Sequence, residues 1–97
     1  MMSNIPVDLS KVSKENVDKE ILRVGIIAEF DAINLYEQLA AKTENSDIKK
    51  VILDIAKEEK THVGEFQALL LSLDRQQAEE LAAGEKEVEK ETGKQIL

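Results

Sequence analysis

The sequence contains no cysteine and no tryptophan, and it has one proline and four glycines among 97 residues. Without cysteine the chain forms neither a disulfide framework nor a thiolate metal site or nucleophile, so oxygen and imidazole remain as metal ligands. Aromatic residues make up 3% of the chain, which argues against an all-β domain. These absences favour one small, helix-rich globular domain.

Basic residues are also in the minority. The chain has 13 Lys and Arg against 20 Asp and Glu, a net charge of −7, which disfavours nucleic acid and anionic membranes as partners and favours cations. No run of 18 apolar residues is present, and the start MMSNIPVDLS lacks the regions of a signal peptide, so we expect a cytoplasmic protein. So short a chain builds a modest core, and we expect it to associate with copies of itself.

The apolar spacing predicts an all-α fold in which two helices form an antiparallel hairpin and a short third helix follows. We expect the first helix over residues 14–43, with Ser13 as its cap. Gly25 is its weak position, and it is a candidate for close approach to another helix. After a short polar connection, Ser46 is expected to cap a second helix over residues 47–73.

The third helix is predicted to begin at Asp74, which forms a capping-box pattern with Gln77. We expect this helix to end near Ala83, because Gly84 follows, and the charged remainder has too few apolar residues to pack a face of its own. The chain then divides into three segments: a flexible arm (1–12), a helical hairpin with its third helix (13–83) and a charged tail or linker (84–97).

Polar side chains interrupt the two apolar seams that face each other in this hairpin. In the second helix, the seam recurs by fours and threes over Ile48, Ile52, Ile55, Glu59, His62, Phe66, Leu69 and Leu73. The first helix carries a comparable stripe over Leu22, Ile26, Glu29, Ile33, Tyr36 and Ala40. Each seam therefore has acidic or imidazole groups at its middle, and a neighbouring stripe of the first helix adds Asp31.

These groups lie at the same height in the hairpin. Glu29 lies 16 residues before Asn45, at the centre of the connection, and Glu59 and His62 lie 14 and 17 residues after it. At 1.5 Å per residue, the three side chains fall within about one helical turn of each other, about 20–25 Å from the loop. A charged layer in an apolar seam is costly unless something compensates it, and neither seam contains Arg or Lys. A bound cation is the compensation that fits.

The ligand set is incomplete within one chain. Ferritin-like di-iron sites take a Glu from each of two helices and a Glu-x-x-His from each of two others, whereas this chain supplies Glu29 and the pair Glu59 and His62. A copy related by a two-fold axis would supply the other half and complete a four-helix bundle. The alternatives are a satisfied core histidine, or a register shifted by one or two residues that turns these groups to solvent.

With these residues in view, the sequence resembles the encapsulated ferritins, short two-helix relatives of ferritin and rubrerythrin that are packaged inside encapsulin shells. The resemblance rests on EFDAINLYEQ (29–38) and DIAKEEKTH (54–62), and it covers about residues 20–73. It implies that Glu29, Glu59 and His62 are the ferroxidase ligands of a di-iron site. It also implies that Tyr36 lies next to the site and that Asp31 matches an acid on the path of incoming metal.

The chain departs from the family pattern at three positions. The family usually has Glu where this chain has Asp31, and some members have a further Glu at the position of Ala28. A tryptophan of the family is replaced by Leu35.

The resemblance also implies a function. Family members form an annular decamer of five dimers, oxidise Fe(II) with dioxygen at a site between two chains and leave iron storage to the encapsulin nanocompartment around them. They are packaged by a C-terminal targeting peptide or by fusion to the shell protein, and the tail of this chain contains no targeting peptide that we recognise. We therefore expect a ferroxidase.

Two rival functions stay open. One is a rubrerythrin-like di-iron peroxidase, although rubrerythrins usually carry a cysteine-rich module and this chain has no cysteine. The other is a non-catalytic helical adaptor or dimerisation module, whose polar layer fixes the register of the helices.

Overall fold

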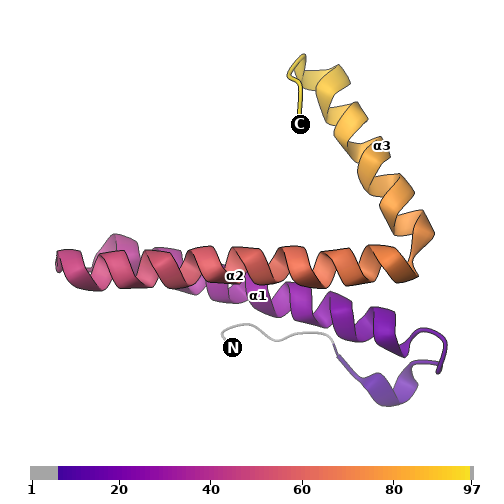
Figure 1. The fold of residues 1–97 in the computed structure, drawn as a ribbon, viewed down its shortest axis with the longest axis horizontal. Helices are drawn as coiled ribbons and strands as arrows, with labels where there is room; N and C mark the ends of the chain where they lie inside the picture. Colours follow the sequence, from indigo (N-terminus) through magenta and orange to yellow (C-terminus); the bar gives the residue numbers. More distant parts are fainter. Residues whose placement is uncertain (1–6, 97) are drawn as a thin grey trace.

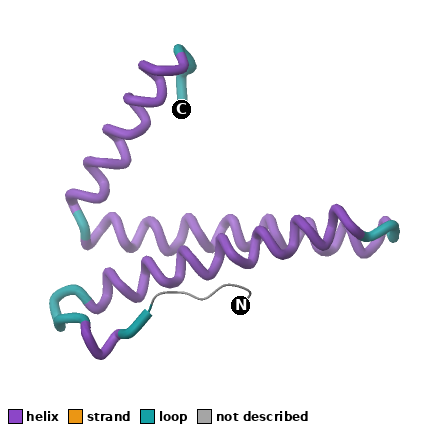
Figure 2. The backbone as a smooth tube through the Cα atoms, turned by 180° about the vertical axis from the view of Figure 1, so that it is seen from behind, coloured by secondary structure: helices purple, strands orange, loops and turns teal. Residues whose placement is uncertain are grey.

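The computed structural model describes residues 7–96, and within that range all regular structure is helical (Figures 1 and 2). A single 3₁₀ turn, η1 (Leu9–Lys11), is followed by α1 (Val17–Lys42), α2 (Ser46–Leu73) and α3 (Arg75–Thr92). The all-α prediction is confirmed. The predicted arm over residues 1–12 falls partly on residues 1–6, which lie outside the described part.

Helices α1 and α2 lie side by side as an antiparallel hairpin (Figure 1). The connection is short because Asn45 caps α2 directly: its Oδ1 accepts hydrogen bonds from the backbone N–H groups of Asp47 and Ile48, both at 3.0 Å. The prediction of Ser46 as the cap was wrong by one residue. Asn and Ser are comparable caps, and here the asparagine one position earlier accepts the backbone N–H groups of both Asp47 and Ile48.

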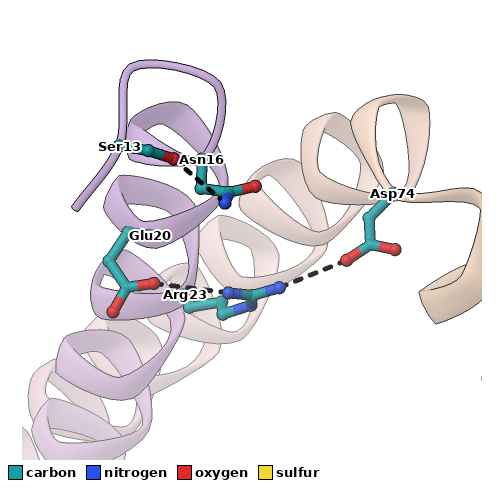
Figure 3. A network of polar contacts seen from close by, with 5 residues as sticks. All are labelled: Ser13, Asn16, Glu20, Arg23 and Asp74. Carbon is teal, nitrogen blue, oxygen red and sulfur yellow. Dashed lines mark hydrogen bonds and ion pairs between the residues drawn. The ribbon is translucent and has the colours of Figure 1, made fainter.

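Helix α1 begins at Val17, three residues after the predicted start. Ser13 does not cap it. Instead, the backbone N–H of Asn16 donates to the Ser13 carbonyl at 3.1 Å, and the Asn16 side-chain amide donates to the Ser13 hydroxyl at 3.1 Å (Figure 3). Residues 13–16 therefore form a separate turn, because the serine hydroxyl is used within that turn rather than by a helical N–H group.

Helix α3 corrects the prediction for the tail. It does not end near Ala83 but continues through Gly84 to Thr92, and it points away from the hairpin at a steep angle (Figures 1 and 2). A glycine inside a helix costs about 1 kcal/mol relative to alanine, which the surrounding Glu, Lys and Ala residues offset through their high helix propensity. The helix ends where Gly93 adopts a left-handed conformation with φ of 71°, as a C-terminal glycine commonly does.

The hairpin has a thin core. Five apolar side chains are buried among the described residues: Leu22, Ile33, Ala40, Ala56 and Leu70. Many larger ones stay exposed, including Leu69 at 57% and Leu73 at 50%. No helix of the described part is long and apolar enough to cross a membrane. So much exposed apolar surface on so small a chain is typical of a protein that packs against another surface.

Asp74 connects all three helices at the open end of the hairpin (Figure 3). One carboxylate oxygen accepts the backbone N–H of Gln77 at 3.0 Å and so caps α3, as predicted, and the other accepts Arg23 of α1 at 3.2 Å. Arg23 also donates to Glu20 at 3.3 Å. The hydrogen bond from Gln77 is the main cause that holds the pKa of Asp74 below its usual range, and the charges of Lys19 and Arg23 add to it.

Replacing Asp74 tests this junction. Asp74→Asn keeps a good helix cap and removes the charge, whereas Asp74→Ala removes both. We expect the melting temperature to fall in the order wild type, Asn, Ala, with loss of helical circular dichroism mainly in the Ala variant. Because folding lowers the pKa of Asp74, its contribution is fully present above the ordinary aspartate value of about 3.9 and is lost as the pH falls through the folded value. Below about pH 4, the wild type should therefore lose more stability than the Asn variant. Equal acid sensitivity of the two proteins would contradict this role.

Candidate metal centre

Three side chains from two helices converge in the middle of the hairpin. Glu29 comes from α1, and Glu59 and His62 come from α2, where residues three apart share a face. Each offers one ligand atom, and these atoms lie within 4.8 Å of one another. His62 Nδ1 is 3.5 Å from Glu29 Oε2 and 3.4 Å from Glu59 Oε2. The structure thus brings together the three residues that were predicted to lie at the same height in the hairpin.

The Glu29 carboxylate lacks a full set of partners. Its side chain is 18% exposed, and its Oε2 atom is buried without a hydrogen bond among the described residues. The approach of His62 Nδ1 is an ion-pair distance that does not meet hydrogen-bond geometry. Leaving a buried acceptor unsatisfied costs about 1–3 kcal/mol, and more for a charged group. A cation at this point would satisfy that oxygen.

No basic side chain neutralises the two carboxylates within the described part of the chain, apart from His62 when it carries a proton. Lys60 follows Glu59 directly, but its ammonium group lies 2.9 Å from the carboxylate of Glu37. Arg23 is occupied by Glu20 and Asp74. The cluster therefore keeps a negative charge that an approaching cation would meet.

The cluster opens on one side of the hairpin. A surface depression there is lined by Glu29, His62, Glu65, Phe66 and Leu69, and His62 is 45% exposed through it. Glu65 at this opening is not among the site residues predicted from the sequence. Its position three residues after His62, on the same side of α2, was the available signal.

An apolar groove continues from this opening toward the end of the hairpin. It is lined by Asp18, Ile21, Leu22, Leu69, Ser72 and Leu73, and Leu69 is common to the groove and the opening. We call the surface formed by Ile21, Phe66, Leu69 and Leu73 the cluster face. The exposed apolar side chains therefore lie on the side of the molecule where the metal cluster opens.

The two other residues implied by the resemblance lie outside the group of three. Tyr36 is half-buried on α1 and is not one of the three residues whose ligand atoms converge. Asp31 is half-buried on the same helix and takes part in an interaction of its own. The structure leaves their proposed roles beside the site as predictions.

Comparisons with known proteins support a ferritin-like assignment. The family model of rubrerythrin matches residues 20–96. A ferritin-like–encapsulin shell fusion protein of Pyrococcus furiosus is 60% identical over 74 residues, which are 76% of this chain and 21% of that protein. An encapsulin nanocompartment cargo protein of Myxococcus xanthus, EncC, is 38% identical over 72 residues, 71% of this chain and 55% of that protein. The chain thus spans about a fifth of the length of the fusion protein and about half of the length of the cargo protein.

A solved structure agrees with the sequence matches. The crystal structure of the encapsulated ferritin domain from Pyrococcus furiosus superimposes with a TM-score of 0.85 at 48% identity, covering 99% of this chain and all of that one. This likeness extends over α3 as well as the hairpin, because nearly the whole chain is covered. The chain therefore belongs to the rubrerythrin family of ferritin-like proteins and, within it, to the encapsulated ferritins.

Proposed function

We propose that this domain is a ferroxidase, which oxidises Fe(II) to Fe(III) with dioxygen at a di-iron site shared between two copies of the chain. One observation carries the proposal: two carboxylates and an imidazole converge within 4.8 Å, and one buried carboxylate oxygen among them lacks a hydrogen bond. Hard oxygen donors combined with one imidazole suit iron. No cysteine competes for the metal in this chain.

The site needs a second copy because one hairpin provides three ligand atoms. A two-fold axis through the cluster face would bring a second Glu29 and a second pair of Glu59 and His62 against the first. Together these make four carboxylates and two imidazoles, the ligand set of ferritin-like di-iron sites. The same contact would bury Leu69 and Leu73, which are exposed in the single chain.

Each ligand has a distinct task in this arrangement. Glu29 and Glu59, on opposite helices, would hold the iron through their carboxylate oxygens, and His62 would add an imidazole nitrogen. With iron bound, the site would supply two electrons, one from each Fe(II), and dioxygen would take them up together with two protons to give hydrogen peroxide. The apolar side chains above and below the cluster limit access of water and hold the ligands in place.

The relatives suggest where this chemistry takes place. Their names describe a shell fusion protein and a nanocompartment cargo protein, so we assign this domain to the interior of an encapsulin nanocompartment in the cytoplasm. The shell protein would be its partner and would store the oxidised iron. As the family resemblance implies, the dimers would assemble into a decamer of five dimers.

Iron oxidation provides the direct test of the ligands. When anaerobic protein with Fe(II) is mixed with air, we expect ferric-oxo absorbance to grow rapidly. Glu59→Ala and His62→Ala should each lower the initial rate at least about tenfold, because each removes a ligand. Glu58→Ala is the matched control, since Glu58 lies next to Glu59 but outside the cluster, and its rate should stay near that of the wild type. Unchanged rates in both ligand variants would refute the assignment.

The unsatisfied oxygen of Glu29 gives a second test, on the metal-free protein. Glu29→Gln replaces a buried charge by a neutral amide that can donate a hydrogen bond to Glu59. We expect the metal-free variant to be more stable by about 1 kcal/mol in chemical denaturation, while iron oxidation is lost. A variant that gains stability and loses iron oxidation would indicate a ferroxidase. In a helical adaptor, the same gain in stability would leave the function unchanged.

Metal content and assembly can be measured together. Native mass spectrometry should show an even-numbered oligomer, and metal analysis of the same sample should find about one iron per chain, because two chains share two irons. A peroxidase with the same site would give the same stoichiometry, but it would consume hydrogen peroxide faster than dioxygen. A monomer without metal would exclude both di-iron functions.

A further inference from the structure

Gly25 and Phe66 form a close contact between the two helices, near the metal cluster. A Cβ atom placed on Gly25 would lie 3.3 Å from three carbons of the Phe66 ring, Cδ2, Cε2 and Cζ. That distance is shorter than an ordinary carbon–carbon contact of about 3.5–4.0 Å. The backbone of α1 therefore rests directly on the ring, and the expected close approach at Gly25 is confirmed.

This contact lies one helical turn from the ligands on both helices. Gly25 is four residues before Glu29, and Phe66 is four residues after His62. At 1.5 Å per residue, each separation is about 6 Å along its helix. Phe66 also lines the opening of the cluster together with Glu29 and His62. The ring is thus in a position to fix how far apart the two helices hold their ligands.

We propose that the Gly25–Phe66 contact is a positioning element, which sets the spacing of α1 and α2 so that Glu29 and His62 reach the same metal ion. Phe66 and Gly25 donate no ligand atom themselves. The inference rests on the proposed function and adds to it the residues that keep the half-site in register. Metal–ligand distances tolerate changes of about 0.2 Å, so a shift of a few tenths of an ångström at this contact is enough to weaken binding.

Alternative explanations of the glycine are weaker. Helix propensity alone would favour alanine at position 25 by about 1 kcal/mol, and no positive φ angle requires glycine there, since Gly93 is the one glycine with positive φ. Gly64 of α2 offers the contrast. A Cβ atom added there would meet nothing within 4 Å, so Gly64→Ala changes helix propensity without touching the ring.

Cobalt binding tests the positioning role without turnover. Co(II) is a redox-stable probe, and its visible absorption depends on the arrangement of its ligands. We expect Gly25→Ala to weaken Co(II) binding about tenfold and to change the spectrum, and Gly25→Val to do so more strongly. Gly64→Ala should leave both unchanged. In a Phe66→Ala background, the further change Gly25→Ala should have almost no effect, because the methyl group no longer meets a ring.

The outcomes separate this inference from the function on which it rests. Equal Co(II) affinity and equal spectra for wild type and Gly25→Ala would overturn the positioning role and leave the ferroxidase proposal intact. A wild type that binds no Co(II), or binds it as well after Glu59→Ala and His62→Ala, would overturn both. The oligomer mass is measured in the same samples, and weaker binding accompanied by loss of the oligomer would assign the contact to assembly and overturn the positioning role.

A structural contact alone would lower stability and leave the metal geometry unchanged. Thermal unfolding of the metal-free variants is therefore recorded alongside, with Co(II) titrated far below each midpoint. A lower midpoint with an unchanged spectrum would count against positioning. If Gly25→Val does not fold, the series of Gly25→Ala, Phe66→Ala and the double variant still gives the coupling between the two positions.

Discussion

Two packed helices cover the charged layer of Glu29, Glu59 and His62 on one side only, whereas a four-helix bundle surrounds such a layer. The rest of the structure depends on this constraint. Glu29 is buried deeply enough to lose water, yet one of its oxygens has no hydrogen bond among the described residues. Burying a carboxylate in this way is unfavourable unless a cation or a proton compensates it. Among the described residues, no lysine or arginine pairs with this carboxylate, so under the proposed function a metal ion and a second copy of the chain would provide the compensation.

The thin core is consistent with the same constraint. A core of five buried apolar side chains leaves Ile21, Leu69 and Leu73 uncovered on the side where the cluster opens. If α3 packed against these residues in the same chain, it would cover the side on which the cluster opens. A second copy of the chain could then not add its ligands there. Instead, α3 leaves the hairpin, and Asp74 with Arg23 fixes the point from which it departs. The cluster face remains open as a result.

Much of this arrangement could be predicted from the sequence because it depends on periodicity. The seams placed Glu29, Glu59 and His62 at one height, and helices of regular rise keep that arithmetic accurate over sixteen residues. The ends of helices were less predictable, because Ser13, Asn16, Asn45 and Ser46 are competing caps of similar strength. The prediction that Gly84 ends the third helix was wrong, because α3 continues through it. The contact between Arg23 and Asp74 could not be foreseen either, since it depends on the angle at which α3 leaves α2.

Under the proposed function, metal binding, association and folding are coupled through the same side chains. A ligand that binds the folded state stabilises it in proportion to the logarithm of its concentration, and here the folded state able to bind iron is also the associated one. In that arrangement, each copy that joins would cover the cluster face of its partner and complete the partner's coordination of the metal. By reciprocity, iron must then favour association as much as association favours iron. Under the proposed function, the unsatisfied Glu29 carboxylate, unfavourable in the single hairpin, would thereby make assembly depend on the metal that the assembled site oxidises.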